Sequence, residues 1–284
     1  MNLIERYKDR LPVEDLKSLV ETAPQKTIRV NTLKTNREEL MNALKYKGFE
    51  VMPHPLHEQS IIIIKEPFSI GATPRYLAGY YMLQDTASMI AVTELNPLPG
   101  ELVLDMAAAP GAKTTHISAL MNNQGVVIAC DNNKKRLRSV LHNCARLNCD
   151  NVIGLNIKGQ DATKLGLEFD KILLDAPCSA EGTIHKNPKI VDKQTPYKKM
   201  ISEQLSLMET GIKLLKKGGT LIYSTCTINP DENEGVVKHA LNQGMKLVQL
   251  ESIGGKPGIG LPETKRFCPN NDNTQGFFIA RLVK

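Results

Sequence analysis

The strongest constraint on the fold is a regular alternation, starting near Glu101, of short apolar runs with longer segments of mixed polarity. Five apolar runs comprise residues 102–104, 126–129, 152–157, 172–174 and 220–223. Runs of this length are typical of parallel strands that are buried on both faces. Alternation with helical segments predicts an α/β fold with a doubly wound, mainly parallel sheet. With candidate strands at 246–250 and 277–282, we expect seven strands in a Rossmann-like arrangement.

The long helix before the fifth run has clear start and stop signals. Thr195 is a candidate N-cap and Pro196 suits the first helical position. Lysines 216–217 suit the last turn, where cations favour the helix dipole, and glycines 218–219 are expected to end the helix.

Residues 1–75 follow a different pattern and predict a small α+β subdomain. Helical periodicity covers residues 11–21 and 37–46, whereas residues 28–30 and 61–64 are strand-like. We therefore divide the chain into an N-terminal subdomain, 1–75, and a larger domain, 76–284.

Length and composition exclude several classes of protein. No apolar run approaches the roughly 20 residues needed to span a bilayer, and the run at residues 61–64 has the length of a strand. The start of the chain lacks the apolar segment of a signal peptide, so we expect a cytoplasmic protein without membrane contact. The six cysteines form no C-x-x-C pair, which gives a metal site little support. They are Cys130, Cys144, Cys149, Cys178, Cys226 and Cys268.

Basic charge concentrates in the middle of the chain. The formal net charge is +6, and residues 183–217 alone hold eight lysines and three acidic residues. Residues 131–158 hold six basic and two acidic residues. A solvated basic surface explains this equally well on charge alone, but the distribution favours a nucleic-acid partner.

Polar residues follow the predicted parallel strands, where ligands bind in open α/β sheets. They are Asp105, Asp131, Asp161, Asp175 and the segment 224–226. After Asp105 comes a turn of small residues leading into a helix: Ala107, Ala108, Ala109, Pro110, Gly111, Ala112 and Lys113. Small side chains let a ligand approach the backbone, and a helix N-terminus offers free N–H groups.

This turn is neither a dinucleotide G-x-G-x-x-G fingerprint nor a P-loop. Asp131 ends the second strand, where a carboxylate can accept hydrogen bonds from ribose hydroxyls; it also suits a cap for the following helix. Together, the turn and Asp131 favour a nucleoside cofactor without separating S-adenosylmethionine from NAD.

Two cysteines follow the fourth and fifth strands. Cys178 lies three residues after Asp175, and Cys226 follows Thr225. If these strands are neighbours, both thiols face one pocket beside the carboxylate. A thiolate that adds to C6 of cytosine makes C5 nucleophilic enough to accept a methyl group, and a second group must help to release the adduct. The residues leave open which thiol is the nucleophile, and either cysteine alone suits a core position.

Several segments of the chain resemble the motifs of a known family. Residues 169–180 are similar to the signature of RNA cytosine-5 methyltransferases of the bacterial Fmu (Sun, RsmB) and eukaryotic Nop2/Sun family. Further similar segments are residues 29–31, 84–88, 105–113, 223–227 and 232–234. The resemblance implies a Rossmann-like methyltransferase fold, S-adenosylmethionine as cofactor and RNA as partner.

The resemblance also implies residue roles. Cys226 is the nucleophile that forms a covalent bond to C6, Cys178 assists product release, and Asp175 and Lys113 are catalytic. The implied cofactor site comprises residues 107–113 with Asp131, Arg136, Asp161 and Asp175. The N-terminal subdomain corresponds to the family's RNA-binding part. Within that subdomain the RNA-binding candidates are Arg29 and Asn31. The position directly after the D-A-P-C segment adds the basic residues Lys186, Lys189, Lys193, Lys198 and Lys199, for which a solvated charged loop is the alternative.

Three other functions fit less well. An amino-methyltransferase needs no cysteine and carries a different segment in place of D-A-P-C, and an NAD oxidoreductase needs the missing glycine fingerprint. A catalytically silent RNA-binding assembly factor does not need both cysteines and Asp175.

Transfer RNA is the preferred substrate, because a short chain suits a compact RNA, and ribosomal RNA is the alternative. Nothing in the sequence indicates an obligate protein partner.

Overall fold

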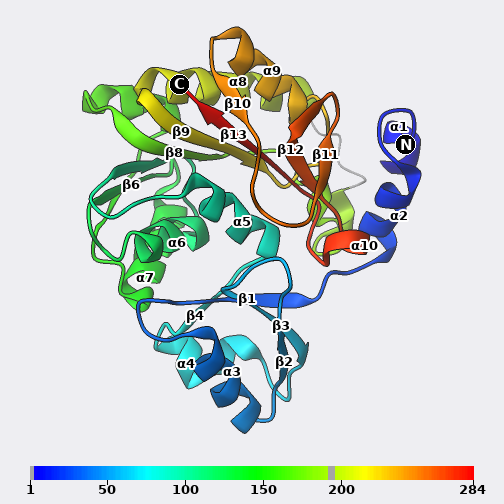
Figure 1. Ribbon diagram of the computed structural model, residues 1–284, viewed down its shortest axis with the longest axis vertical. Coiled ribbons are helices and arrows are strands. Elements are labelled where there is room, and N and C mark those ends of the chain that lie inside the picture. Colours follow the sequence, from blue (N-terminus) through cyan, green and yellow to red (C-terminus); the bar gives the residue numbers. More distant parts are fainter. Residues whose placement is uncertain (1–2, 191–195) are drawn as a thin grey trace.

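The computed structural model describes residues 3–190 and 196–284 (Figure 1). Its strands form two sheets, one of four strands and one of nine. The small sheet lies at one end of the molecule and the large sheet, with helices on both faces, forms the rest.

The small sheet is antiparallel, with strand order β2-β3-β1-β4. Its strands are β1 (Lys26–Val30), β2 (Glu50–Pro53), β3 (Ser60–Lys65) and β4 (Tyr81–Leu83). Its helical segments are α3 (Arg37–Tyr46), η1 (Ile70–Ala72) and α4 (Pro74–Leu77). The apolar face of α3 packs Leu40 and Leu44 against Ile28 and Ile61 of the sheet. The Asn36 side chain caps α3 by accepting a hydrogen bond from the Glu39 N–H at 3.0 Å.

The first two helices lie elsewhere. The residues of α1 (Leu3–Tyr7) and α2 (Val13–Glu21) pack against Ile184 and Ile228, which follow strands of the large sheet (Figure 1). Strand β4 continues the small sheet beyond residue 75. The proposed division of the chain at residue 75 stays a prediction.

Five parallel strands form the main part of the large sheet, in the order β7-β6-β5-β8-β9. They are β5 (Leu102–Asp105), β6 (Val126–Cys130), β7 (Val152–Leu155), β8 (Phe169–Asp175) and β9 (Leu215–Thr225). On one face lie α5 (Thr86–Leu95), α6 (Ala112–Leu120) and α7 (Lys134–Leu147). On the other face lie α8 (Tyr197–Leu214) and α9 (Glu234–Asn242). The doubly wound α/β class is thereby confirmed.

Four antiparallel strands complete this sheet beside β9: β10 (Lys246–Val248), β11 (Lys256–Gly258), β12 (Leu261–Phe267) and β13 (Phe277–Val283). The described residues thus give nine strands, and our prediction of seven was too low. The hairpin of β11 and β12 escaped prediction because β12 mixes polar and apolar residues and has no apolar run.

The remaining short elements are η2 (Gly159–Leu165), η3 (Glu181–Thr183), η4 (Pro188–Ile190) and α10 (Pro269–Asp272). No helix in the described ranges is long and apolar enough to cross a membrane.

The predicted end of the long helix is wrong. Helix α8 ends at Leu214, and Lys216 to Gly219 belong to β9, where the register with β8 shifts. Leu215 is fully buried and pairs with Phe169 of β8, so the chain enters the strand here, and Lys216 Nζ also pairs with Asp170 Oδ1 at 2.7 Å. At the other end, Pro196 takes the N-cap position itself, and the predicted N-cap Thr195 lies outside the described residues.

Candidate active site

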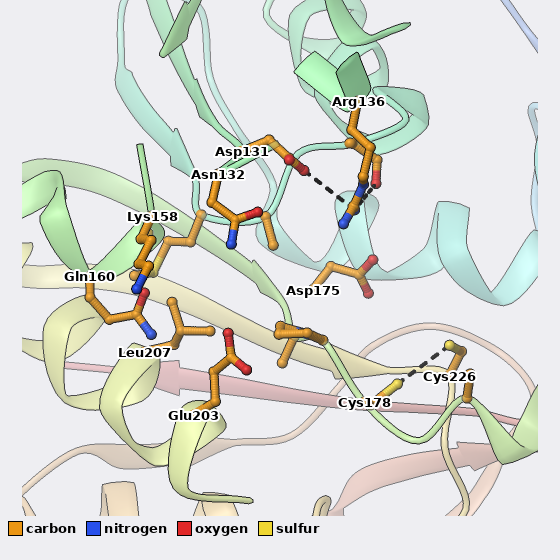
Figure 2. Close-up of a pocket in the computed structure, with 17 residues that line it drawn as sticks. Asp131, Asn132, Arg136, Lys158, Gln160, Asp175, Cys178, Glu203, Leu207 and Cys226 are labelled. Carbon is orange, nitrogen blue, oxygen red and sulfur yellow. Dashed lines mark hydrogen bonds and ion pairs between the residues drawn. The ribbon is translucent and has the colours of Figure 1, made fainter. Parts of the chain in front are cut away.

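A pocket of about 230 Å³ opens at the carboxyl ends of the parallel strands, where the strand order reverses between β5 and β8. Figure 2 shows Asp131 and Arg136 at one end of this pocket, the two cysteines at the other and Asp175 between them. The predicted residues that line it are Ala107, Ala109, Asp131, Arg136, Asp175, Cys178 and Cys226. Those that do not are Ala108, Pro110, Gly111, Ala112, Lys113 and Asp161.

The turn after β5 holds backbone close to the pocket. Gly111 has a φ of 100°, and a Cβ atom there would lie 2.9 Å from the Cα of Val140 in α7, so glycine is required. Gly159, on the opposite wall, is equally constrained, because a Cβ would lie 2.7 Å from the Met106 carbonyl oxygen. Gly111 therefore keeps the turn packed against α7, whereas Gly159 offers bare backbone on the pocket wall itself.

Asp105, at the end of β5 just before this turn, is buried, and only one of its two carboxylate oxygens forms a hydrogen bond. Its Oδ2 accepts a hydrogen bond from Thr114 Oγ1 at 2.7 Å, whereas no described residue bonds to its Oδ1. Burial raises the pKa of Asp105 to about 6.

Asp131 supports the start of α7 and also lines the pocket, and its contact with ribose hydroxyls stays a prediction. Its Oδ1 accepts a hydrogen bond from the Asn133 N–H at 2.8 Å, just before α7, and its Oδ2 pairs with Arg136 at 3.3 Å. The side chain still lines the pocket. Asp161, by contrast, pairs with Lys164 at 2.7 Å, and its neighbour Gln160 lines the pocket instead.

Several lining residues escaped sequence analysis: Met106, Asn132, Lys158, Gly159, Gln160, Ala176, Pro177, Ala180, Glu203 and Leu207. Asn132 directly follows Asp131, so its position at the end of a predicted strand could have identified it. Glu203 and Leu207 come from the middle of α8, where no turn or strand end marks them, so only the tertiary packing brings them to the pocket.

Asp175 at the end of β8 connects three elements. It accepts hydrogen bonds from Lys113 Nζ of α6 at 2.6 Å and from Ser224 Oγ of β9 at 2.8 Å. Burial disfavours the Lys113 ammonium, yet the adjacent carboxylate holds the pKa of Lys113 above its usual value. A buried cation is thus fixed beside the two cysteines.

The thiols of Cys178 and Cys226 lie 3.4 Å apart, and either can donate to the other. The hydrogen bond from Cys178 lowers the pKa of Cys226, Lys113 lowers it further, and these effects exceed the opposing effects of burial and Asp175. The same hydrogen bond, together with burial, raises the pKa of Cys178. The site therefore favours Cys226 as the thiolate.

We predict that Lys113→Met moves the alkylation of Cys226 to higher pH. Removing the ammonium takes away a charge that favours the thiolate and leaves the Asp175 carboxylate, which disfavours it. The measurement is the iodoacetamide alkylation rate of Cys226 against pH, by peptide mass spectrometry. Lys171→Met is the control, because Lys171 bonds to Thr220 at the other end of β8. An unchanged midpoint in Lys113→Met would contradict the electrostatic role.

Arg29 and Asn31 do not reach the surface, so our prediction that they contact RNA was wrong. Both are fully buried. Arg29 donates to Gln84 Oε1, to the Ala112 carbonyl and to Thr115 Oγ1, and Asn31 donates to the Gly79 and Leu147 carbonyls. These side chains join the small sheet to the helices of the large domain.

The predicted basic residues after the D-A-P-C segment are exposed where the structure describes them. Lys186, Lys189, Lys198 and Lys199 lie on the surface, and Lys193 lies outside the described residues. Lys186 Nζ also donates to Gln275 Oε1 at 2.9 Å. Their role in RNA binding stays a prediction.

Comparison with known proteins gives matches over nearly the whole chain. The model of the family "16S rRNA methyltransferase RsmB/F" matches residues 92–283, and that of the RsmF/B-like ferredoxin-like domain matches residues 2–70. A human 28S rRNA (cytosine(4447)-C(5))-methyltransferase is 37% identical over 99% of this chain. A tRNA (cytosine(72)-C(5))-methyltransferase from Pyrococcus horikoshii is 41% identical over 76% of this chain.

The matched regions cover 37% and 55% of those two curated relatives, so the chain corresponds to only part of their length. Among solved structures, NSun6 from Pyrococcus horikoshii with SFG has a TM-score of 0.92 and 30% identity. That match covers 100% of this chain and 97% of the other.

Proposed function

The chain belongs to the RsmB/F and Nop2/Sun family of RNA methyltransferases, and from this membership we propose that it methylates carbon 5 of cytosine in RNA. The observation that carries the proposal is the pair of thiols 3.4 Å apart beside a lysine–aspartate pair, within the pocket at the strand ends. Methylation of an exocyclic amine or a hydroxyl group needs neither thiol.

In this proposal Cys226 is the nucleophile. Its thiolate adds to C6 of cytosine, and the electron pair displaced toward C5 makes C5 able to accept a methyl group. After methylation a base removes the C5 proton, and the returning electrons expel the Cys226 thiolate. Cys178 stays protonated next to Cys226 and is placed to return a proton to the departing thiolate.

Lys113 and Asp175 support this chemistry. Lys113 stabilises the Cys226 thiolate by its charge. Asp175 holds Lys113 and lines the pocket, where its carboxylate is placed to contact the amino group of the target base. A base that reacts here must leave its stack to enter the pocket.

The residues present fit S-adenosylmethionine as the cofactor. The bare backbone of Gly159, the carboxylate of Asp131 on the pocket wall and the unpaired buried oxygen of Asp105 suit a nucleoside that carries a cationic amino group. When bound, this cofactor supplies the electrophilic methyl group. Asp131, Arg136 and the residues of the turn would hold it, with Asp175 at the end nearest the cysteines.

For the substrate we propose transfer RNA, with ribosomal RNA as the alternative. The support is the identity of 41% to the tRNA (cytosine(72)-C(5))-methyltransferase over 76% of the chain; the human 28S rRNA enzyme is 37% identical over 99% of it. The exposed lysines 186, 189, 198 and 199 would follow the RNA backbone, so affinity should fall as salt rises. A cytoplasmic location is a further part of the proposal.

Bisulfite sequencing tests the function. Total RNA is incubated with S-adenosylmethionine and either wild-type protein or Cys226→Ala, and we expect newly protected cytosines in tRNA with wild type only. Newly protected cytosines in ribosomal RNA instead of tRNA would identify ribosomal RNA as the substrate. Protection by both proteins would remove Cys226 as the nucleophile, and protection by neither, with cofactor and RNA bound, would favour an RNA-binding factor without catalysis.

A further inference from the structure

We infer that Glu232 is a positioning residue that clamps the two cysteine-bearing loops together and so fixes the contact between Cys178 and Cys226. Glu232 lies in the loop before α9 and does not line the pocket. It is fully buried, and no Lys or Arg within residues 3–190 and 196–284 forms an ion pair with it. A buried carboxylate without a counter-ion needs a full set of hydrogen-bond donors.

Those donors come from the loops that carry the cysteines. Glu232 Oε2 accepts from the backbone N–H of Ser179, the residue after Cys178, at 2.9 Å. Its Oε1 accepts from Ser179 Oγ at 2.6 Å and contacts Thr227 Oγ1, next to Cys226, at 3.5 Å. The Ser179 and Thr227 hydroxyls also lie 2.6 Å apart. The carboxylate thus binds the neighbour of Cys178 directly and is connected to the neighbour of Cys226 mainly through the Ser179 hydroxyl.

Gln204 and Asn233 add further hydrogen bonds that hold the two cysteine-bearing loops. Gln204 Nε2 of α8 donates both to Glu232 Oε2 and to the Pro177 carbonyl, each at 2.9 Å, so the residues on both sides of Cys178 are held. On the other loop, Asn233 accepts from Thr225 Oγ1 at 2.6 Å and donates to the Thr227 carbonyl at 3.0 Å. Glu232, Gln204 and Asn233, together called the clamp, therefore fix the backbone on both sides of Cys178 and of Cys226, and with it the position of each thiol.

Chemically, the clamp keeps the Cys178 thiol within hydrogen-bond distance of Cys226. Given the proposed function, this contact favours the Cys226 thiolate for attack and presents a proton for its departure. The other ionisable groups that face Cys226 are Lys113 from α6 and Asp175 from β8, whereas Tyr223 and Glu232 face Cys178. Loosening the clamp should weaken the thiol–thiol contact and leave Lys113 and Asp175 in place.

The test variant is Glu232→Gln. A glutamine oxygen can replace Oε2, but its amide then puts N–H donors at the Oε1 position, where Ser179 Oγ and Asn229 Nδ2 donate to the carboxylate. The hydrogen bonds toward the second loop must therefore rearrange. We expect kcat for methylation to fall about tenfold or more, with KM for RNA and cofactor unchanged within about twofold. We also expect a denaturation-resistant RNA adduct to accumulate, because release is slowed more than attack.

Alkylation of Cys226 by iodoacetamide in the protein alone gives a readout that needs no methylation. In Glu232→Gln its pH midpoint should move upward, because the thiolate loses its hydrogen bond from Cys178. Ser179→Ala removes only the hydroxyl contacts and should give smaller changes in the same direction, and it serves where Glu232→Gln does not fold. Glu94→Gln is the matched control: Glu94 is a buried glutamate paired with Arg281 at 3.2 Å, and it should change none of these readouts.

Folded Glu232→Gln and Ser179→Ala proteins with the wild-type alkylation profile and no adduct would overturn the clamp. So would equal effects of Glu94→Gln, since these would indicate general destabilisation. Wild-type protein that methylates no RNA would instead overturn the proposed function, and the alkylation profiles would then decide on the clamp by themselves.

Discussion

Cys178→Ala is expected to retain RNA as a covalent adduct that survives denaturation, whereas Cys226→Ala is expected to form no adduct and to lose methylation altogether. The reason is the division of roles between two thiols 3.4 Å apart. Without Cys226 no nucleophile reaches C6, so activity should fall by at least about a thousandfold. Without Cys178 the Cys226 thiolate still attacks, but the proton held beside it is missing when the adduct must break.

Denaturing gel electrophoresis with labelled RNA measures the adduct, and methyl incorporation measures turnover. The double variant should resemble Cys226→Ala, because without Cys226 no covalent adduct forms and none has to be released. Cys268→Ala is the control: Cys268 is buried away from the pocket, and burial raises the pKa of its thiol to about 12. An adduct that forms in Cys226→Ala but not in Cys178→Ala would reverse the two roles.

Arg29→Ala is expected to lower the free energy of unfolding by about 3 kcal/mol. Arg29 is among the largest fully buried side chains, and its loss leaves a cavity and removes the donor from Gln84 Oε1 and the Ala112 carbonyl. Burial lowers the pKa of Arg29 to about 9, which reflects the cost of a buried cation and offsets part of the loss. Urea denaturation measures the effect.

Because Ala112 begins α6, which carries Lys113, we also expect weaker methylation in Arg29→Ala. Arg29→Lys keeps the charge but not the forked donor geometry and should be intermediate. Arg138→Ala, at an exposed position on α7, is the control and should change stability by less than about 0.5 kcal/mol. A loss below about 1 kcal/mol in Arg29→Ala would contradict a joining role between the small sheet and the large domain.

Arg29 also illustrates how a correct motif led to a wrong function. The segment 29–31 was recognised, and RNA contact was inferred for Arg29 and Asn31 because the subdomain that holds them resembles the family's RNA-binding part. A charged side chain is ordinarily exposed, and only the packing of β1 against α6 and α7 shows that these polar groups satisfy buried backbone. Sequence patterns give no direct signal of such an interface.

The two ends of α8 make a similar point at the level of local structure. The lysines and glycines at 216–219 are ordinary helix-ending residues, yet they lie in β9, where Leu215 is buried beside Phe169 of β8 and Lys216 pairs with Asp170. A tertiary ion pair and strand pairing thus override a local signal. The strand β12 was missed for a related reason, since its polar residues find partners only in the folded sheet.

What the sequence determined by itself is the α/β class, the five parallel strands and the strand ends at which Asp131, Asp175, Cys178 and Cys226 meet. These follow from apolar periodicity and from the rule that parallel strands gather their carboxyl ends at one edge. Only the tertiary structure decided the burial of Arg29, the lining of the pocket by Glu203 and Leu207, and the contacts of Glu232. Each of these depends on distances between segments far apart in the chain, and a linear pattern contains no such distances.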